Sequence, residues 1–167
     1  MTPDRDDIRM DPWATHLPAL LACVAHTMGP VLELGCGVYS TPVLHAACAG
    51  RHLVSVDRHA PWVQRFAHMR SKDHAVICAP DGAELAAHEW DVVLVDSTPA
   101  QGRIEEIARL RATSRLLVIH DTEPGRPVYR YDQILPSFPH ARVWDREPTW
   151  TTIVSDVDDL AWLEGLL

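Results

Sequence analysis

The sequence predicts an α/β protein built on a mostly parallel sheet with helices on both faces. Three observations support this prediction. Five short apolar runs recur at regular intervals over the first 120 residues, and stretches with helical periodicity separate them. A glycine-rich turn directly follows the first run. Two more runs, separated only by a short polar segment, follow residue 120. Alternating strands and helices favour parallel pairing through crossovers, whereas the closing pair favours an antiparallel arrangement.

The predicted strands are Val31–Leu34, Leu53–Val56, Ala75–Ala79, Asp91–Val95 and Leu116–Ile119, followed by Ala141–Trp144 and Thr151–Ser155. The first five are almost uniformly apolar, which is typical of strands buried on both faces. The predicted helices are Trp13–Met28, Thr41–Cys48, Pro61–Met69 and Gly102–Arg111, and Ala83–His88 is an ambiguous short helical stretch. The first of these helices has apolar residues at helical spacing and ends at Gly29-Pro30.

Length and charge limit the organisation of the chain. Its 167 residues predict a single domain over 1–167, with a loose N-terminal arm over 1–12. The net charge of −8, without a basic block, argues against a broad nucleic-acid surface. An acidic, polar start and the lack of a long apolar run predict a cytoplasmic protein that does not enter a membrane. A homodimer is compatible with the sequence.

Cysteine and histidine spacing indicates neither a disulfide framework nor a metal site. The cysteines at positions 23, 36, 48 and 78 show no C-x-x-C spacing, so we expect reduced, packed thiols. The ten histidines are scattered without metal-ligand spacing. We expect most of them at the surface or partly buried on helices.

The turn after the first strand carries the main functional signal. Glu33 lies in the strand, Gly35 and Gly37 follow, and Ser40-Thr41-Pro42 is a helix-start signal. Asp57 ends the next strand, twenty residues beyond Gly37. A strand, glycine turn, helix, strand and carboxylate in this order form a unit that binds a nucleoside through its ribose hydroxyls.

The type of nucleoside follows from two departures from the dinucleotide pattern. Ser40 occupies the place of the third glycine, and Glu33 lies where a pyrophosphate would be repelled but an ammonium group attracted. The pattern Glu33-x-Gly35-x-Gly37 with distal Asp57 resembles the class I S-adenosylmethionine-dependent methyltransferases. The resemblance implies their three-layer Rossmann-like fold, with a seven-stranded, mostly parallel sheet and an antiparallel C-terminal strand.

The same resemblance implies a set of cofactor-binding residues. Gly35 and Gly37 would let the backbone approach S-adenosylmethionine, and Glu33 would shape the turn and face the ammonium group. Asp57 would accept from both ribose hydroxyls, since a carboxylate has two oxygens to offer a cis-diol. Asp81, after the third strand, would accept from the adenine amino group.

Polar residues after the fourth and fifth strands predict the catalytic groups. Asp96 follows one strand, and His120-Asp121 follows the other. In one mechanism, His120 or Asp121 acts as a general base without a metal. In the other, Asp96 and Asp121 hold magnesium, as in the catechol O-methyltransferases that this layout resembles. Thr122 stands where that group has asparagine, no lysine follows Asp96, and Glu123 would be a substitute ligand.

A second resemblance concerns the substrate. Val95 to Arg103, together with Val118-Ile119-His120-Asp121, is similar to a pattern in the plant glucuronoxylan methyltransferases, which modify a sugar hydroxyl. It implies that Arg103 binds a substrate carboxylate. Tyr129 falls in a segment that would cover the pocket, and Trp13 and His16 could close over the cofactor.

The sequence therefore predicts methyl transfer from S-adenosylmethionine to a small molecule, at a hydroxyl oxygen. Three alternatives remain open. The acceptor could be an amine or a peptide nitrogen. The cofactor could instead be cyclised within its own side chain without methyl transfer. The chain could also be a non-catalytic partner subunit with the same fold.

Overall fold

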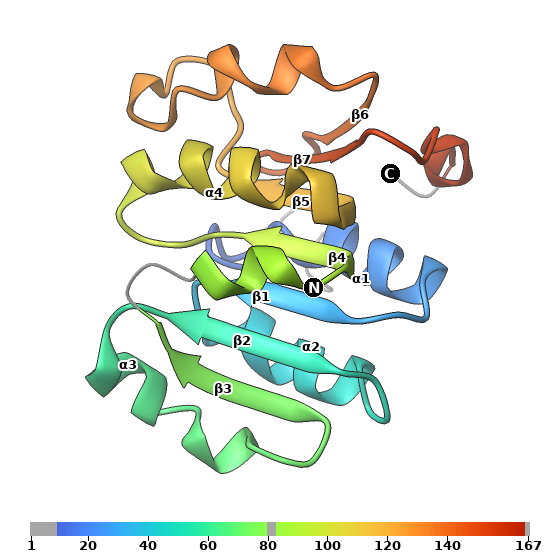
Figure 1. Ribbon diagram of the computed structural model, residues 1–167. Helices are drawn as coiled ribbons and strands as arrows, with labels where there is room; N and C mark the ends of the chain where they lie inside the picture. Colours follow the sequence, from blue (N-terminus) through green and yellow to red (C-terminus); the bar gives the residue numbers. More distant parts are fainter. Residues whose placement is uncertain (1–9, 80–82, 166–167) are drawn as a thin grey trace, which may run out of the picture.

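A computed structural model describes residues 10–79 and 83–165 and contains one seven-stranded sheet (Figure 1). The strand order is β3-β2-β1-β4-β5-β7-β6. The strands are β1 Val31–Leu34, β2 Leu53–Asp57, β3 His74–Cys78, β4 Trp90–Val95, β5 Ser114–His120, β6 His140–Trp144 and β7 Thr151–Ser155. The predicted α/β class and the seven strands are thus confirmed, with most boundaries shifted by one or two residues.

The direction of the strands defines the functional edge of the sheet. The first five strands are parallel, and β7 is antiparallel to both of its neighbours, β5 and β6. The predicted antiparallel C-terminal strand is therefore confirmed. The chain passes outward from β1 to β2 and β3 on one side and to β4 and β5 on the other. The strand order reverses between β1 and β4, and ligands of open α/β sheets bind outside the carboxyl ends of the strands at such a point.

Helical segments cover both faces of the sheet. Helices α1 (Leu17–His26) and α2 (Ser40–Ala47) lie behind it in Figure 1, and α4 (Arg103–Leu110) lies in front. The short helix α3 (Ala60–Gln64) packs against β2 and β3. Because every face of the first five strands is covered, the apolar runs of the sequence become the interior of three layers.

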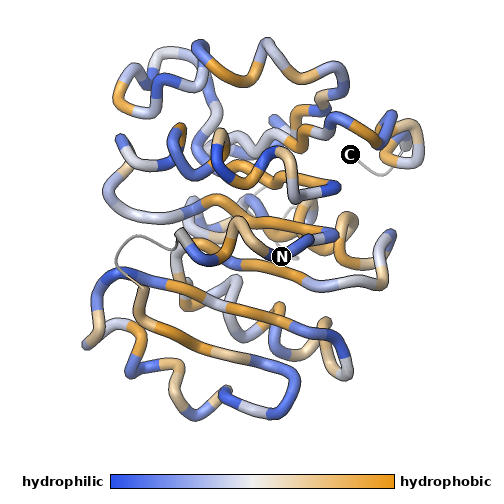
Figure 2. Tube along the Cα trace, viewed as in Figure 1, coloured by the Kyte–Doolittle hydropathy of each residue, from blue (hydrophilic) through white to orange (hydrophobic). Residues whose placement is uncertain are grey.

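Two hydrophobic cores follow from this layering. In Figure 2 the strands form a hydrophobic centre between more hydrophilic turns. One core joins the sheet to α4, with Ile107 and Leu110 fully buried, and the other joins it to α1, with Leu20 and Val24 buried. The two cores fix the positions of the strand ends, from which the polar side chains of the site project.

The first helix is shorter than the predicted Trp13–Met28. It begins at Leu17 with Pro18 in its first turn, where the missing N–H is tolerated. The residues before it form turns, and Thr15 and His16 are buried there. The predicted loose arm over 1–12 lies largely outside the described residues. Its last residues, from 10 onward, form a turn that leads into this buried segment.

Two other helical predictions needed correction. The predicted helix Pro61–Met69 ends as α3 at Gln64 and continues as a separate 3-10 turn over Ala67–Met69. The ambiguous stretch at Ala83–His88 forms a 3-10 helix over Ala83–Ala87. Both segments are too short to gain much from helical cooperativity, so packing decides their form.

The cysteines and histidines only partly match their expected environments. All four thiols are free, and three of them are buried, but Cys78 is exposed rather than packed. Seven of the ten histidines are exposed or partly buried, as expected for most of them, whereas His16, His74 and His120 are buried. Over the described residues, no helix has the length and apolarity needed to cross a membrane.

Candidate active site

The glycine turn after β1 depends on close backbone contact. Gly35 has a φ of +94°, and a Cβ at this position would overlap the backbone carbonyl of Asp96 at the end of β4. Its amide donates to the Val56 carbonyl at 2.8 Å. Glycine alone tolerates both the positive φ and the close approach. The turn is therefore wedged between the ends of β2 and β4.

Glu33 supports this turn from below. The Thr41 hydroxyl donates to the Glu33 carboxylate at 2.9 and 3.0 Å and accepts from the Gly37 amide at 2.9 Å. The Glu33 side chain is fully buried, and this burial raises its pKa to about 7. Glu33 is thus tied to the turn through Thr41. It does not line the adjoining cavity, and its role toward an ammonium group stays a prediction.

A cavity of about 590 Å³ opens above the turn. Its size is typical of small-molecule sites. The walls comprise Asp11, Trp13, His16, Cys36, Gly37, Val38, Tyr39, Ser40, Asp57, His59, Trp62, Asp96 and Thr98. The Trp62 indole donates to the Cys36 carbonyl at 2.6 Å and so braces the turn from the side of α3. Of the sequence-predicted cofactor residues, Gly37 and Asp57 line this cavity.

Asp57 is half-buried at the end of β2. Its Oδ1 accepts from the His59 amide at 2.9 Å, which shows that the side chain also stabilises the following turn. Among the described residues, no hydrogen bond reaches its other oxygen. Asp57 thus combines a local structural contact with an oxygen available to a ligand. Asp81, predicted to contact adenine, lies outside the described residues.

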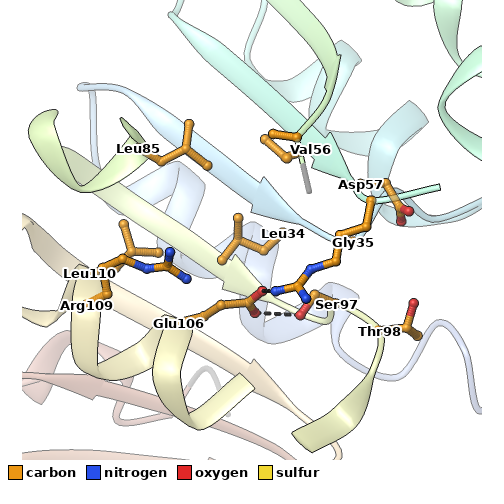
Figure 3. A pocket seen from close by; sticks show the side chains of 12 residues that line it. Leu34, Gly35, Val56, Asp57, Leu85, Ser97, Thr98, Glu106, Arg109 and Leu110 are labelled. Atoms are coloured by element: carbon orange, nitrogen blue, oxygen red, sulfur yellow. Dashed lines mark hydrogen bonds and ion pairs between the residues drawn. The ribbon is translucent and has the colours of Figure 1, made fainter. Parts of the chain in front are cut away.

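On the other side of Asp57, a second space is almost filled (Figure 3). It has a volume of about 20 Å³, room for little more than one water molecule. Its apolar wall includes Val56 and Leu85, and Arg58 spans it to bind Glu106 at 3.1 Å. Glu106 also accepts a 2.5 Å hydrogen bond from the Ser97 hydroxyl, so these polar groups close the space from the α4 side (Figure 3).

Arg103, at the start of α4, lies between the two carboxylates predicted as catalytic. Its guanidinium donates to Asp96 Oδ1 at 2.8 Å and to Asp121 Oδ2 at 3.1 Å. It also donates to the carbonyls of Ser97 at 2.7 Å and His120 at 3.2 Å. The side chain is buried, and its fork already contacts four groups of the protein, so its predicted role toward a substrate carboxylate stays a prediction.

The position of Arg103 also bears on the predicted magnesium site at Asp96 and Asp121. A magnesium ion shared by Asp96 and Asp121 would need the space between them, which the Arg103 guanidinium occupies. The positive charge of Arg103 already compensates both carboxylates. The residues present therefore do not fit the ligand set of the catechol O-methyltransferases.

Both carboxylate oxygens of Asp121 accept hydrogen bonds from other side chains. The residue has a left-handed φ of +61°, and its Oδ2 also accepts from the Tyr129 hydroxyl at 2.8 Å. Its Oδ1 accepts from Arg126 at 3.2 Å. Non-glycine residues keep such a conformation only where surrounding contacts hold it. Asp121 is thus placed to hold Arg103 and Tyr129 rather than to meet a ligand directly.

His120 projects from the end of β5 and is almost fully buried. Its Nδ1 lies 3.3 Å from Asp96 Oδ1, and its Nε2 lies 2.6 Å from the Thr149 hydroxyl and 3.0 Å from the Thr15 hydroxyl. The pKa of Asp96 is low: burial alone would raise it, but the hydrogen bond from His120 and the charge of Arg103 outweigh burial. Asp96 is therefore a carboxylate at neutral pH.

His16 completes this group of ionisable side chains. Its ring centroid lies 4.7 Å from that of His120, and it lines the 590 Å³ cavity together with Asp96. Burial is the main cause that lowers the pKa of His16 to about 4, and the neighbouring His120 lowers it further. The imidazole of His16 is therefore neutral near pH 7.

A second cavity of about 330 Å³ adjoins the first. Its walls comprise Pro12, Trp13, Asp96, Thr98, Ala100, Arg103, His120, Asp121, Arg126, Tyr129 and Thr149. The two cavities share Trp13, Asp96 and Thr98. Tyr129 is on the wall of this second cavity. Glu123 instead borders a different hollow of about 410 Å³ and forms a 2.5 Å ion pair with Arg126.

Comparisons with known proteins agree on the architecture. No protein-family model matches the chain, and no curated protein sequence matches it. Among solved structures, a putative O-methyltransferase from Klebsiella pneumoniae aligns with a TM-score of 0.65 at 14% identity, over 91% of this chain and 82% of that one. The N-terminal domain of human METTL16 in complex with SAH aligns with a TM-score of 0.62 at 12% identity, over 90% of this chain and 73% of that one. The fold is that of the class I methyltransferases.

The comparisons concern the shared fold and not the properties of the neighbours as whole proteins. A kinase-inhibitor complex of WbdD aligns with a TM-score of 0.58 and 14% identity over 85% of this chain, but the chain spans only 39% of WbdD. WbdD is described as a bifunctional kinase-methyltransferase. At sequence identities of 12–14%, the likeness between this chain and these proteins is a likeness of fold.

Little in the sequence indicates which residues surround His120. Thr15 and Thr149 are 134 positions apart, yet both contact the His120 ring. His16 is 104 residues from His120, so no motif spacing connects them. In this methyltransferase fold, the segment before α1 and the turn before β7 meet above the end of β5.

Proposed function

We propose that this protein is an S-adenosylmethionine-dependent methyltransferase that modifies a small molecule at a hydroxyl oxygen. The observation that carries the proposal is the 590 Å³ cavity at the switch point of a methyltransferase fold, bounded by the Gly37 turn and by Asp57. A ligand site at this position and of this size fits a nucleoside cofactor.

The cavity walls fit the parts of S-adenosylmethionine. The unpaired oxygen of Asp57 is available for a ribose hydroxyl, and the turn at Gly37 permits close backbone approach. Trp62 and Tyr39 add aromatic surface to the same wall. Aromatic faces attract cations, so this wall also suits a positively charged ligand.

The junction of the two cavities fits methyl transfer. S-adenosylmethionine, when bound, would supply a methyl group activated by its sulfonium. Asp96 lies at the junction, bonded to His120, and this pair is positioned to take the proton of an acceptor hydroxyl in the second cavity. Trp13 borders both cavities and would shield the reacting groups from water.

Calorimetric titration with S-adenosylmethionine and S-adenosylhomocysteine tests the cofactor assignment. We expect saturable binding of both, reduced at least about tenfold by Asp57→Ala because a hydrogen bond to a charged group is lost. Asp159→Ala is the matched control. Its Oδ1 accepts from the amide two residues on, at 2.9 Å, as that of Asp57 does, but it lies beyond β7 at the opposite edge of the sheet. A folded wild-type protein that binds neither ligand would refute the proposal.

Product analysis then tests the reaction. With a panel of hydroxyl and amine acceptors, we expect S-adenosylhomocysteine together with an O-methylated product. Methylation of amines alone would identify a nitrogen acceptor instead. Methylthioadenosine in place of S-adenosylhomocysteine would indicate cyclisation, and binding without any turnover would favour a partner subunit.

A further inference from the structure

His16 is buried without a polar partner. Its side chain is 1% exposed, and neither ring nitrogen has a hydrogen-bond partner among the described residues. Buried polar atoms in proteins are almost always satisfied, so an orphaned imidazole requires an explanation. The ring faces Asp96 and His120, and one ligand atom from each of the three residues lies within 4.8 Å of the others.

The hydrogen-bond partners of His120 allow a tautomer that carries its proton on Nε2. The Thr15 hydroxyl can donate to the carbonyls of Thr149 and Pro12, at 2.9 and 3.2 Å, and the Thr149 hydroxyl can donate to Pro12 at 3.3 Å. Both hydroxyls are therefore free to accept from Nε2–H of His120. A neutral His120 in this tautomer presents the lone pair of Nδ1 to Asp96 Oδ1 at 3.3 Å. In this tautomer a metal cation between the two acceptors would satisfy both, whereas in the other tautomer the Nδ1–H of His120 donates to Asp96 itself.

We propose that His16, Asp96 and His120 bind a divalent transition-metal ion at the junction of the two cavities. Two neutral imidazoles and one carboxylate suit iron, cobalt, nickel or zinc, whereas magnesium prefers oxygen ligands. Metal–ligand bonds of about 2.1 Å place tetrahedral ligand atoms about 3.4 Å apart. The three ligand atoms lie within 4.8 Å of one another, so the separations longer than about 3.4 Å would have to shorten when the ion binds.

Neighbouring residues already orient two of the three ligands, Asp96 and His120. Arg103 holds Asp96 at 2.8 Å, and Thr15 and Thr149 hold the far nitrogen of His120. Metal-binding histidines commonly donate their second N–H to an oxygen in this way, which fixes the ring for ligation. Asp121 is excluded from the ligand set because its oxygens accept from Arg103, Tyr129 and Arg126.

The position of the ion would define the class of acceptor. Three protein ligands leave coordination positions open, and Asp96 and His120 both border the second cavity. A hydroxyl oxygen of an acceptor in that cavity would take an open position and lose its proton to water more readily there. This role rests on the proposed function, whereas metal binding itself does not.

Titration with Co²⁺ tests the site directly. Tag-free protein is stripped with a chelator, desalted and titrated with Co²⁺ while the visible d–d absorption is recorded. We expect one equivalent to bind, Zn²⁺ to displace it, and millimolar Mg²⁺ to leave it in place. His16→Ala should weaken Co²⁺ binding at least about 100-fold because one of three ligands is lost. His68→Ala, an exposed histidine outside the cluster, should bind as the wild type does.

A second measurement needs no variant. In the proton NMR spectrum of the Co²⁺-loaded wild type, we expect two hyperfine-shifted, exchangeable imidazole N–H signals, one from each histidine ligand. Thr149→Val keeps all three ligands but removes a hydrogen bond to His120, so it should weaken Co²⁺ binding about tenfold. Absence of stoichiometric Co²⁺ binding to the folded wild type, absence of these signals, or unchanged binding by a folded His16→Ala protein would overturn the metal site. S-adenosylmethionine binding, measured on the same stripped samples, separates this failure from failure of the proposed function.

Discussion

The hydroxyl of Thr41 donates to the buried carboxylate of Glu33 at 2.9 Å and thereby links the first strand to the helix that follows the glycine turn. The same oxygen accepts from the Gly37 amide, so the Thr41 side chain contacts both the buried Glu33 and the turn that borders the cavity of about 590 Å³. Glu33 thus acts on the cavity through Thr41, without lining the cavity itself.

Thr41→Val should lower the free energy of unfolding by about 2–3 kcal/mol, because the buried Glu33 carboxylate loses one of its donors and the Gly37 amide loses its acceptor. Urea unfolding measures this change. Thr41→Ser, which keeps the hydroxyl, is the control and should recover most of the loss. Thr41→Val should also bind S-adenosylmethionine more weakly than Thr41→Ser. Equal stability of the two variants would contradict the role of the hydroxyl.

Glu33→Gln should change how stability depends on pH. The folded-state pKa of Glu33, about 7, lies above the unfolded value near 4.5, so the folded protein retains a proton that the unfolded chain loses. The contribution of Glu33 to stability is therefore present below about pH 4.5 and falls as pH rises to about 7. Relative to wild type, Glu33→Gln should gain on the order of 3 kcal/mol between pH 4.5 and 8.

Urea unfolding at several pH values tests this difference. Comparison with wild type is needed because His16 and His74, with pKa values lowered to about 4, contribute the opposite slope in both proteins. A difference between the two proteins that does not vary with pH would show that Glu33 titrates normally in the folded state.

Gly35→Ala should be strongly destabilising, by at least about 3 kcal/mol. It combines a positive φ with overlap between the new Cβ and the Asp96 carbonyl. Gly50→Ala separates the two causes, because Gly50 has a similar φ of +81° but nothing within 4 Å of its added Cβ. It should cost only about 1 kcal/mol. Similar losses of thermal stability in both variants would mean that the close approach to Asp96 is unimportant.

Arg103→Met should reduce stability by about 3–5 kcal/mol, because Asp96 and Asp121 would be left without their shared positive charge. The exposed pair of Arg142 and Glu164 provides the control. Arg142→Met should cost less than about 1 kcal/mol. Chemical denaturation at pH 7 compares the two. If Arg103 instead bound a substrate carboxylate, its removal would affect substrate KM and leave the apo protein as stable as wild type.

Local signals were sufficient for the sheet and for the cofactor half of the site. The apolar runs predicted seven strands, and the antiparallel direction of Thr151–Ser155 followed from the short connection before it. Gly37 and Asp57 line the cavity because both belong to one strand–turn–strand unit, whose geometry is set within about 25 residues. Such short-range patterns determine their structure before distant segments matter.

The catalytic half could not be predicted in the same way. The sequence placed Asp96, His120 and Asp121 at neighbouring strand ends, and the structure brings them together there. The sequence did not show that Arg103 joins Asp96 to Asp121. That contact depends on how α4 packs against the sheet.

The sequence by itself determined the layered α/β fold, the glycine turn and the carboxylates at the strand ends, because these follow from periodicity and from backbone sterics. The tertiary structure alone decided that His16 lies beside His120 and that Thr15 and Thr149 hold its ring. The contacts of Thr15 and His16 with His120 join segments more than 100 residues apart in the chain. Their geometry depends on the packing of the segment before α1 over the sheet, for which a linear pattern carries no signal.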